Sequence, residues 1–259
     1  MDRKLQNWKK FCQYYSGDLY GIWTRYSTAG EVIESWRCIR SFRPTADCHE
    51  IHHQNHYSYA NGKTETKTFE PYKQPITTGL FLDKGFSWGS TKVKSGSTFF
   101  SDICLRYENS RATAIAKYDE SGSLKRFTVF PEYLGHFLDA VAHGGTTKTA
   151  LHRFVNVSAL PPAHQISSDW QGTLQTITPD WQISPPVVTS WQPLDDLPED
   201  YLRLHFTNGI SISCPAQVES GKEFFVAVDW LVNQTVWQRG TRHYDRSGFT
   251  SFTLEVFRI

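Results

Sequence analysis

The most constraining feature of this 259-residue sequence is an internal repeat. Residues 85–130 match residues 209–253 in order, at a shift of about 125 positions. The glycines of the matched turns tolerate positive φ, and the runs between them are rich in Val, Phe, Trp and Thr, which favour strands. The sequence therefore predicts a duplicated antiparallel β-meander. The matched pairs of segments are 93–96 with 218–221, 99–100 with 224–225, and 118–122 with 244–248.

The front of the repeat matches more weakly. Residues 21–24 align with residues 172–175, and the Ser-Trp pair at 35–36 aligns with the Ser-Trp pair at 190–191. Between these landmarks and Gly85 the first half carries about thirty extra residues. We therefore expect fewer or shorter strands in the second half.

Two helices are predicted around the first half. Apolar residues recur at helical spacing from Leu5 to Tyr15, and Gly17 follows as a stop signal. A second helical pattern begins at Pro131 and ends at Gly144. We expect these helices over one mouth of the first β domain and at its exit.

Composition narrows the class of protein. The formal net charge is +1 and no Lys/Arg stripe interleaves with aromatic residues, so we expect no nucleic-acid partner. No run of 18 apolar residues occurs, which predicts no membrane span. The first ten residues are polar and charged, so no secretory signal is expected and a cytoplasmic location is predicted. The five cysteines have wide, irregular spacings, which predicts free, mostly buried thiols.

Gly21-Ile22-Trp23, on a strand after a short helix, resembles the G-x-W opening of lipocalins. In that superfamily an Arg packs over the Trp in a cation–π contact; Arg126 and Arg258 are the candidates here, whereas Leu174 replaces the Trp in the second half. This motif, Ser35-Trp36-Arg37 and residues 239–244 together resemble a cyanobacterial and plastid family that pairs two lipocalin-like barrels. One plastid group of that family acts in assembly of ATP synthase.

The repeat and the resemblance together predict the fold. We expect an all-β protein of two lipocalin-like antiparallel β-barrels from an internal duplication, with short helices at the N-terminus and after the first barrel. Residues 1–145 would form the first barrel and residues 146–259 the second. The segment 160–168, which contains two prolines, is the expected linker.

A histidine run at residues 49–56 is the first candidate for chemistry. On a strand, His52 and His56 would stand about 13 Å apart, so they could not share a zinc ion without ligands from neighbouring strands. Solvent-facing or pocket-lining histidines are one interpretation, a metal site a second, and acid–base work by a group such as His53 a third. We predict no metal site.

A second candidate cluster lies near the end of the chain. An inward Arg242 could bind a carboxylate through paired hydrogen bonds, and Tyr244 could donate to a carbonyl or enolate. The structural alternative is an Arg–Asp surface pair with a core Tyr. If the protein is an enzyme, we predict a cofactor-independent cyclase, isomerase or lyase with Arg242, Tyr244 and His53 as catalytic residues.

Aromatic residues make up 15% of the chain, and every second residue of a barrel strand faces inward. We predict that the protein binds a bulky hydrophobic small molecule such as a tetrapyrrole, a carotenoid or a polycyclic metabolite, without a cofactor. The alternative is an assembly factor with filled barrels that binds a protein partner such as an ATP synthase subunit. The predicted ligand-binding residues are Trp36, Trp88, Tyr107, Trp191, Trp230, Trp237 and Arg239.

Overall fold

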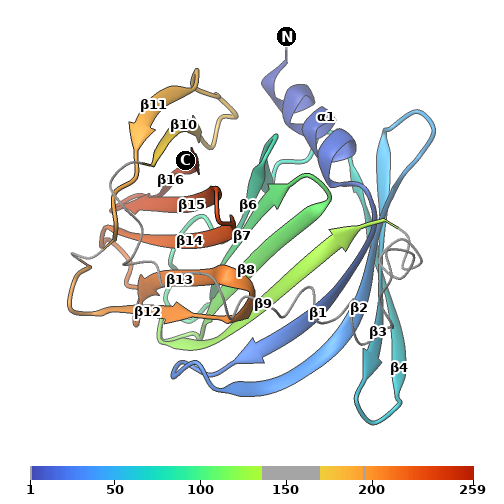
Figure 1. Cartoon of the computed structure of the whole chain (residues 1–259), viewed down its shortest axis with the longest axis horizontal. Helices are drawn as coiled ribbons and strands as arrows, with labels where there is room; N and C mark the ends of the chain where they lie inside the picture. Colours follow the sequence, from blue (N-terminus) through green and yellow to red (C-terminus); the bar gives the residue numbers. More distant parts are fainter. Residues whose placement is uncertain (1, 136–169, 195–196) are drawn as a thin grey trace.

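The computed structural model describes residues 2–135, 170–194 and 197–259, and these residues form two antiparallel sheets with little helix (Figure 1). The prediction of an all-β fold is confirmed. The elements of the first half are α1 (Arg3–Tyr15), β1 (Gly17–Tyr26), β2 (Val32–Pro44), β3 (Glu50–Tyr59), β4 (Thr64–Lys73), β5 (Gly79–Leu82), β6 (Gly85–Gly89), β7 (Phe99–Tyr107), β8 (Ser110–Tyr118) and β9 (Leu124–Leu134). The second half has β10 (Gln171–Ile177), β11 (Val187–Ser190), β12 (Tyr201–His205), the short 3₁₀ helix η2 (Thr207–Gly209), β13 (Ile210–Pro215), β14 (Phe224–Asn233), β15 (Val236–Asp245) and β16 (Gly248–Arg258).

The N-terminal helix α1 agrees with the prediction. The Asp2 side chain caps it by accepting a hydrogen bond from the backbone N–H of Lys4. Its apolar face buries Trp8, Phe11 and Tyr15, and Gly17 follows at a φ of +114°. The helix therefore has one face that must be covered, and the first sheet covers it.

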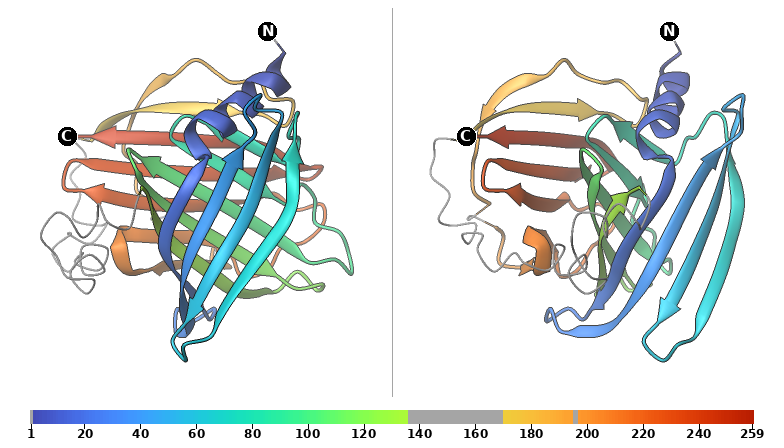
Figure 2. Two further views of the ribbon diagram at one scale, coloured as in Figure 1. Left: turned by 90° about the vertical axis from the view of Figure 1, so that its right-hand side faces the viewer. Right: turned by 45° about the vertical axis from the view of Figure 1, so that its right-hand side comes forward.

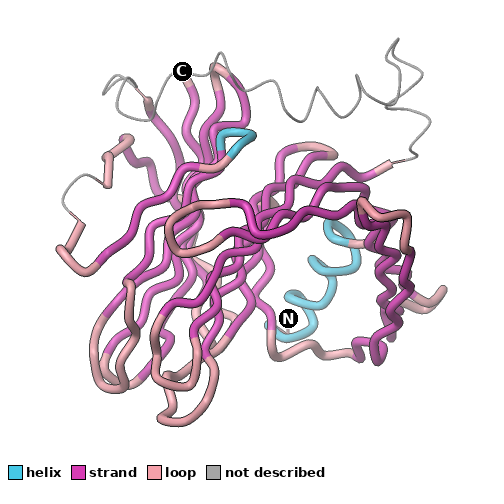
Figure 3. Tube along the Cα trace, turned by 90° about the horizontal axis from the view of Figure 1, so that it is seen from below, coloured by secondary structure: helices cyan, strands magenta, loops and turns pink. Residues whose placement is uncertain are grey.

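The first sheet has the strand order β4-β3-β2-β1-β9-β8-β7-β6-β5. It curls strongly, and α1 lies inside the curve at one end (Figure 3). No backbone pairing joins β4 to β5 among the described residues. The curve is instead closed by side chains, because Tyr72 of β4 and Trp88 of β6 meet with ring centroids 5.3 Å apart. The first half is thus a curled half-barrel.

The second sheet repeats the topology of the first. Its order is β11-β10-β16-β15-β14-β13-β12, so β10 pairs with β16 as β1 pairs with β9. Gly21 and Gly172 occupy the same register position, opposite Glu132 and Phe257. The second sheet has no equivalent of β3 and β4 among the described residues, as the shorter second half predicts.

The two sheets pack against each other through one shared core (Figure 2). Alternate residues of β7 and β8 meet alternate residues of β13, β14 and β16 there. The backbones approach closely where side chains are missing: a Cβ at Gly240 would lie 2.8 Å from Ile103, and one at Gly85 would lie 3.1 Å from Leu254. We call this shared core between the sheets the joint. Each sheet therefore buries one face in the joint and turns its other face away from it.

Three expectations differ from the structure. Over the described residues the sheets do not close, and the first is a curled half-barrel, whereas closed barrels were expected. Pro131 to Leu134 extend β9, because this segment pairs with both β1 and β8; the rest of the predicted second helix, the linker at 160–168 and the 145/146 boundary lie outside the described residues. Trp191 is not the counterpart of Trp36: register places Trp191 opposite Trp170, which corresponds to the Leu19–Arg40 pair.

Candidate ligand-binding site

The face of the first sheet that points away from the joint is the concave face of the curl, and α1 covers one end of it; we call this face the basin. An ion pair between Arg40 of β2 and Glu132 of β9 lies at its floor. The two side chains meet across β1 because Gly21 stands between them; a Cβ on Gly21 would lie 2.8 Å from the Glu132 side chain. The glycine of the G-x-W motif is therefore needed for the ion pair.

Trp23 completes the motif. Its indole N–H donates to Glu132 Oε1 at 3.2 Å, and its ring stacks on Phe130 with centroids 4.1 Å apart. The guanidinium of Arg40 lies 5.6 Å from the Trp23 ring. The expected Arg-over-Trp contact thus exists, but Arg40 of the neighbouring strand makes it. Arg126 and Arg258 were the wrong candidates.

The floor of the basin carries a second buried arginine. Arg111 of β8 donates to the backbone carbonyls of Tyr14 and Tyr15 at the end of α1, at 2.8 and 3.3 Å. Burial lowers the pKa of Arg111. Burial also acts to lower the pKa of Arg40, but Glu132, together with Cys104, Asp102 and Cys38, outweighs it and the pKa is raised. Arg40, Arg111 and Glu132 are only 6%, 1% and 0% exposed.

Asp102 of β7 is the most perturbed acid in the basin. Burial, opposed by Arg40 and Arg242, raises its pKa to about 7. Its Oδ1 atom is shielded from solvent and has no hydrogen-bond partner in the part of the chain that the structure describes. The Nε of Arg40 is also buried without a partner. A concave site with a carboxyl group that titrates near neutrality and unmet polar atoms is typical of a functional site.

His53 lies on the wall of the basin and is fixed there. Its ring stacks on Phe69 with centroids 4.2 Å apart and contacts the Tyr72 hydroxyl at 3.2 Å and Asn55 Oδ1 at 3.0 Å. Burial, and then the charge of Arg40, lower its pKa to about 4. His53 is therefore neutral at neutral pH. Among the described residues, no His, Cys, Asp and Glu side chains gather in a group of three that could hold a metal ion.

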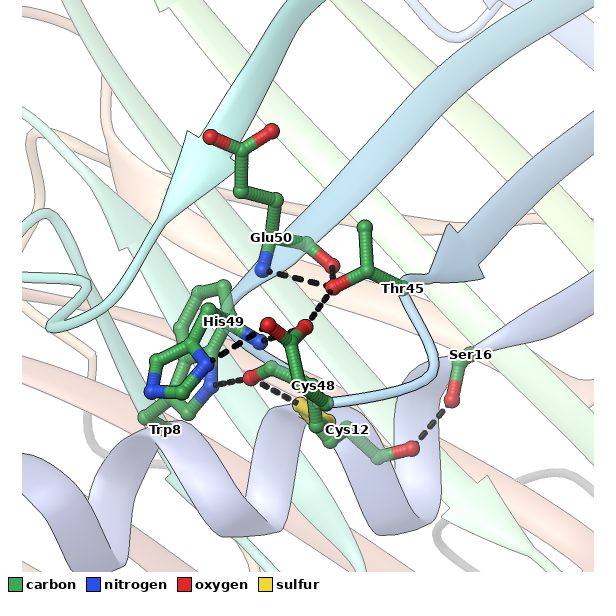
Figure 4. The surroundings of a disulfide bond; sticks show 8 residues. Trp8, Cys12, Ser16, Thr45, Cys48, His49 and Glu50 are labelled. Atoms are coloured by element: carbon green, nitrogen blue, oxygen red, sulfur yellow. Dashed lines mark hydrogen bonds and ion pairs between the residues drawn. A yellow bond between two sulfur atoms is a disulfide. The ribbon is translucent and has the colours of Figure 1, made fainter.

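The cysteines partly correct the prediction of free thiols. Cys12 of α1 and Cys48 of the β2–β3 loop form a disulfide (Figure 4). They meet because Trp8, one turn before Cys12, donates to the Cys48 carbonyl at 2.6 Å and so docks this loop on the helix. Cys38 and Cys104 are free and buried. Burial raises the pKa of Cys38 to about 12 and the pKa of Cys104 to about 11. Neither basin thiol is a thiolate at neutral pH.

Comparison with protein families decides the relationship of the chain. The model of an N-terminal domain of unknown function, DUF3598, matches residues 4–137, which is 134 of 259 residues. The chain belongs to the DUF3598 family. In this DUF3598 protein, residues 195–256 also match the C-terminal domain of the "Biogenesis factor required for ATP synthase 1". This second match covers β12 to β16.

A solved structure shares the fold of this chain. A DUF3598 family protein from Nostoc punctiforme, of unknown function, aligns with a TM-score of 0.73 at 18% identity and covers 97% of this chain and 98% of its own. This likeness shows the fold alone. A Bacteroides fragilis structure described as a candidate outer membrane protein covers 100% of both chains at 8% identity, but its TM-score of 0.25 carries no argument. Comparison with curated proteins gave no match.

Two of the predicted catalytic residues lie in the joint between the sheets of the DUF3598 protein. Arg242 donates to the Ser87 hydroxyl and to the Ser90 carbonyl, and its Nε donates to the Tyr244 hydroxyl at 2.7 Å. Tyr244 in turn donates to the Ser90 carbonyl at 3.0 Å. Arg242 and Tyr244 are 2% and 4% exposed. These bonds tie β15 to the β6 end of the first sheet.

The predicted ligand-binding residues fall into three places. Trp36 and Trp88 lie in the basin, together with half-buried Trp23 and Tyr57. Tyr107 and Trp230 pack in the shared core of the joint. The remaining three, Trp191, Trp237 and Arg239, lie on the outer face of the second sheet.

Sequence reasoning missed the charged residues of the basin. Arg40, Asp102 and Glu132 stand in three strands far apart in the sequence, without a shared motif. One signal was present: Gly21 and Trp23 mark a strand on which an Arg was expected to pack. Alternation on β2 places Trp36, Cys38 and Arg40 on one face and would have named Arg40. Among the described residues, no helix has the length and apolar character to cross a membrane.

Proposed function

We propose that the basin of the curled sheet binds a bulky, flat, largely apolar small molecule. The observation that carries the proposal is the combination of half-buried rings, Trp23, Tyr57 and Trp88, with the unpartnered polar atoms of Arg40 and Asp102 on one concave face. Rings offer flat contact area at low entropic cost, and a few polar groups fix orientation. A tetrapyrrole, a carotenoid or a polycyclic metabolite has this shape.

A cofactor-independent cyclase or isomerase activity would use the same basin. Asp102 is then the residue suited to proton transfer, since its pKa is raised to about 7 by burial. His53 is less suited, because its pKa of about 4 leaves it a weak base. Arg242 and Tyr244 are committed to backbone and side-chain partners in the joint.

Titration of the purified protein with biliverdin, β-carotene and methyl 1-pyrenebutanoate tests the binding proposal, with Trp quenching and ligand absorbance as readouts. Trp88→Ala removes a basin ring and is expected to weaken binding about tenfold or more. Trp181→Ala, at a Trp contacted by Lys4 outside the basin, is the matched control and should leave binding unchanged. Absence of saturable binding for all three probes would overturn the proposal.

A second candidate function is assistance in ATP synthase assembly. The match of residues 195–256 to the C-terminal domain of an ATP synthase biogenesis factor favours it. The partner would then be an ATP synthase subunit that contacts the second sheet. Size-exclusion chromatography of the full chain mixed with purified catalytic-head subunits tests this function. Co-elution that survives Trp88→Ala supports it, whereas separate elution with every subunit counts against it.

A further inference from the structure

We infer that the basin binds an anionic head group, a carboxylate on the flat apolar ligand, against Arg40 at its floor. This inference rests on the proposed ligand-binding function and adds the chemical class of the ligand. Its basis is the balance of buried charge between Arg40, Arg111 and Glu132.

The floor holds more positive than negative charge. Arg40 and Arg111 are both buried, and Glu132 is the carboxylate that acts on both of them. Arg111 donates to two backbone carbonyls, which are neutral acceptors and do not balance its charge. Asp102, the other carboxyl group that acts on Arg40, is held largely protonated below neutral pH. Below neutral pH one positive charge at this buried position is therefore uncompensated, which is costly.

Unmet hydrogen-bond donors lie on the same face. Arg40 Nε and the indole Nε1 of Trp36 are buried and unpartnered, and the two residues are 6% and 8% exposed. Both atoms are donors, and a protonated Asp102 would add a third. A carboxylate supplies several acceptor lone pairs and one negative charge, so it would accept from Arg40 and cancel the excess charge together. An uncharged ester would do only part of this.

A matched pair of probes tests the inference on the full chain. 1-Pyrenebutanoic acid and its methyl ester share the ring, and only the acid carries a negative charge. We expect the acid to bind about tenfold or more tightly at pH 6, measured by pyrene fluorescence. Equal affinities would overturn the carboxylate anchor but leave ring binding intact. Loss of binding for both probes would instead overturn the proposed function.

Substitution identifies the anchor. In Arg40→Gln the charges of Arg111 and Glu132 cancel, so the affinity advantage of the acid over the ester should disappear. Arg43→Gln is the control, because Arg43 lies on the same strand but its side chain is 70% exposed and pairs with Asp18. An unchanged acid-to-ester ratio in a folded Arg40→Gln protein would contradict the inference. Should this variant fail to fold, the wild-type ratio and the Asp102 variant below still decide.

The pH profile gives an independent readout. The charged and titratable groups that act on or face Asp102 are Arg40, Glu132, Arg242 and Tyr72. Ionisation of Asp102 would cancel the excess charge, so affinity for the acid should fall between pH 6 and pH 8, whereas ester affinity should not. Asp102→Asn should abolish this dependence. A pH dependence that persists in Asp102→Asn would show that another group controls binding and would count against the inference.

Discussion

The two sheets share one topology but use the corresponding face in opposite ways. In the first sheet this face is the basin, with half-buried rings and unmet polar atoms around Arg40 and Glu132. In the second sheet the positions of Leu19, Arg40 and Glu132 are taken by three large apolar residues that fill the face. These are Trp170, Trp191 and Phe257, at 3%, 3% and 0% exposure.

The ion pair of the second sheet is also complete where that of the basin is not. Asp229 accepts from Arg239 Nε at 2.7 Å and from Trp237 Nε1 at 3.1 Å. Arg239 also donates to the Gln192 carbonyl at 2.8 Å and lies 4.2 Å from the Trp191 ring. With all partners supplied by the protein, this pair stabilises packing. The comparison shows that one copy of the meander leaves buried polar atoms unpartnered on this face, whereas the other pairs Arg239 with Asp229 and fills the face with apolar side chains.

The largest expected effect is a loss of stability in the second sheet. Asp229→Ala leaves a buried Arg239 without a counter-charge, which should lower the free energy of unfolding by about 3–5 kcal/mol. Urea denaturation measures this, with binding of methyl 1-pyrenebutanoate as the second readout. Because Asp229 is on the second sheet, ester affinity should be unchanged in the folded fraction. A loss below about 1 kcal/mol would mean that the pair does not support this core.

The disulfide between Cys12 and Cys48 cross-links the first half of the chain, so its loss should affect the first sheet. The Cys12→Ser/Cys48→Ser variant opens a link that spans 36 residues, so we expect a loss of about 3–4 kcal/mol in unfolding free energy. A dithiol reductant should destabilise the wild-type protein by a similar amount and should leave the double variant unaffected. Equal denaturation midpoints for reduced and oxidised wild type would contradict the prediction.

The equivalent glycines test whether the copies differ in function as well as in packing. Gly21→Ala and Gly172→Ala each place a Cβ against the backbone carbonyl of the neighbouring strand, at Pro131 and Val256. Each should cost about 1–3 kcal/mol of stability. Only Gly21→Ala also displaces Glu132, so it alone should weaken binding of 1-pyrenebutanoic acid. Equal effects on binding would remove the distinction between the copies.

The smallest expected effect is the net pH dependence that arises in the basin of the wild-type protein, because two contributions there oppose each other. His53 has its pKa lowered to about 4, so its contribution to stability rises with pH between about 4 and 6.5. Asp102 has its pKa raised to about 7, so its contribution falls with pH between about 4 and 7. The two trends oppose each other below pH 6.5 in the wild-type protein.

The Asp102→Asn variant separates these trends. Its unfolding free energy should rise more steeply than that of wild type between pH 4 and pH 6.5, with at most about 1.4 kcal/mol per pH unit from His53, because the opposing Asp102 contribution is removed. Urea denaturation at pH 4.5, 5.5 and 6.5 measures the slope, with wild type as the control. Parallel curves for the variant and wild type would show that Asp102 titrates normally in the folded protein.

Much of the fold could be read from local patterns. The duplicated turns at 118–122 and 244–248 identify the two meanders because turn geometry is set by the residues of the turn itself. Helix α1 followed from the spacing of Trp8, Phe11 and Tyr15, which is again a local property. The segment from Pro131 was misread as a helix, since pairing with β1 and β8 overrides local preference there.

The sequence by itself determined the repeat, the strand-rich class, the first helix and the G-x-W motif, because each depends on residues that are neighbours along the chain. Only the tertiary structure decided which face of each sheet is packed. Strand alternation separates two faces but does not say which meets another sheet, so Arg242 and Tyr244 proved to lie in the joint. The basin depends on the pairing of β2 and β9 with the two edges of β1, which brings Arg40 to Glu132 across 92 residues of sequence, and no local pattern encodes that contact.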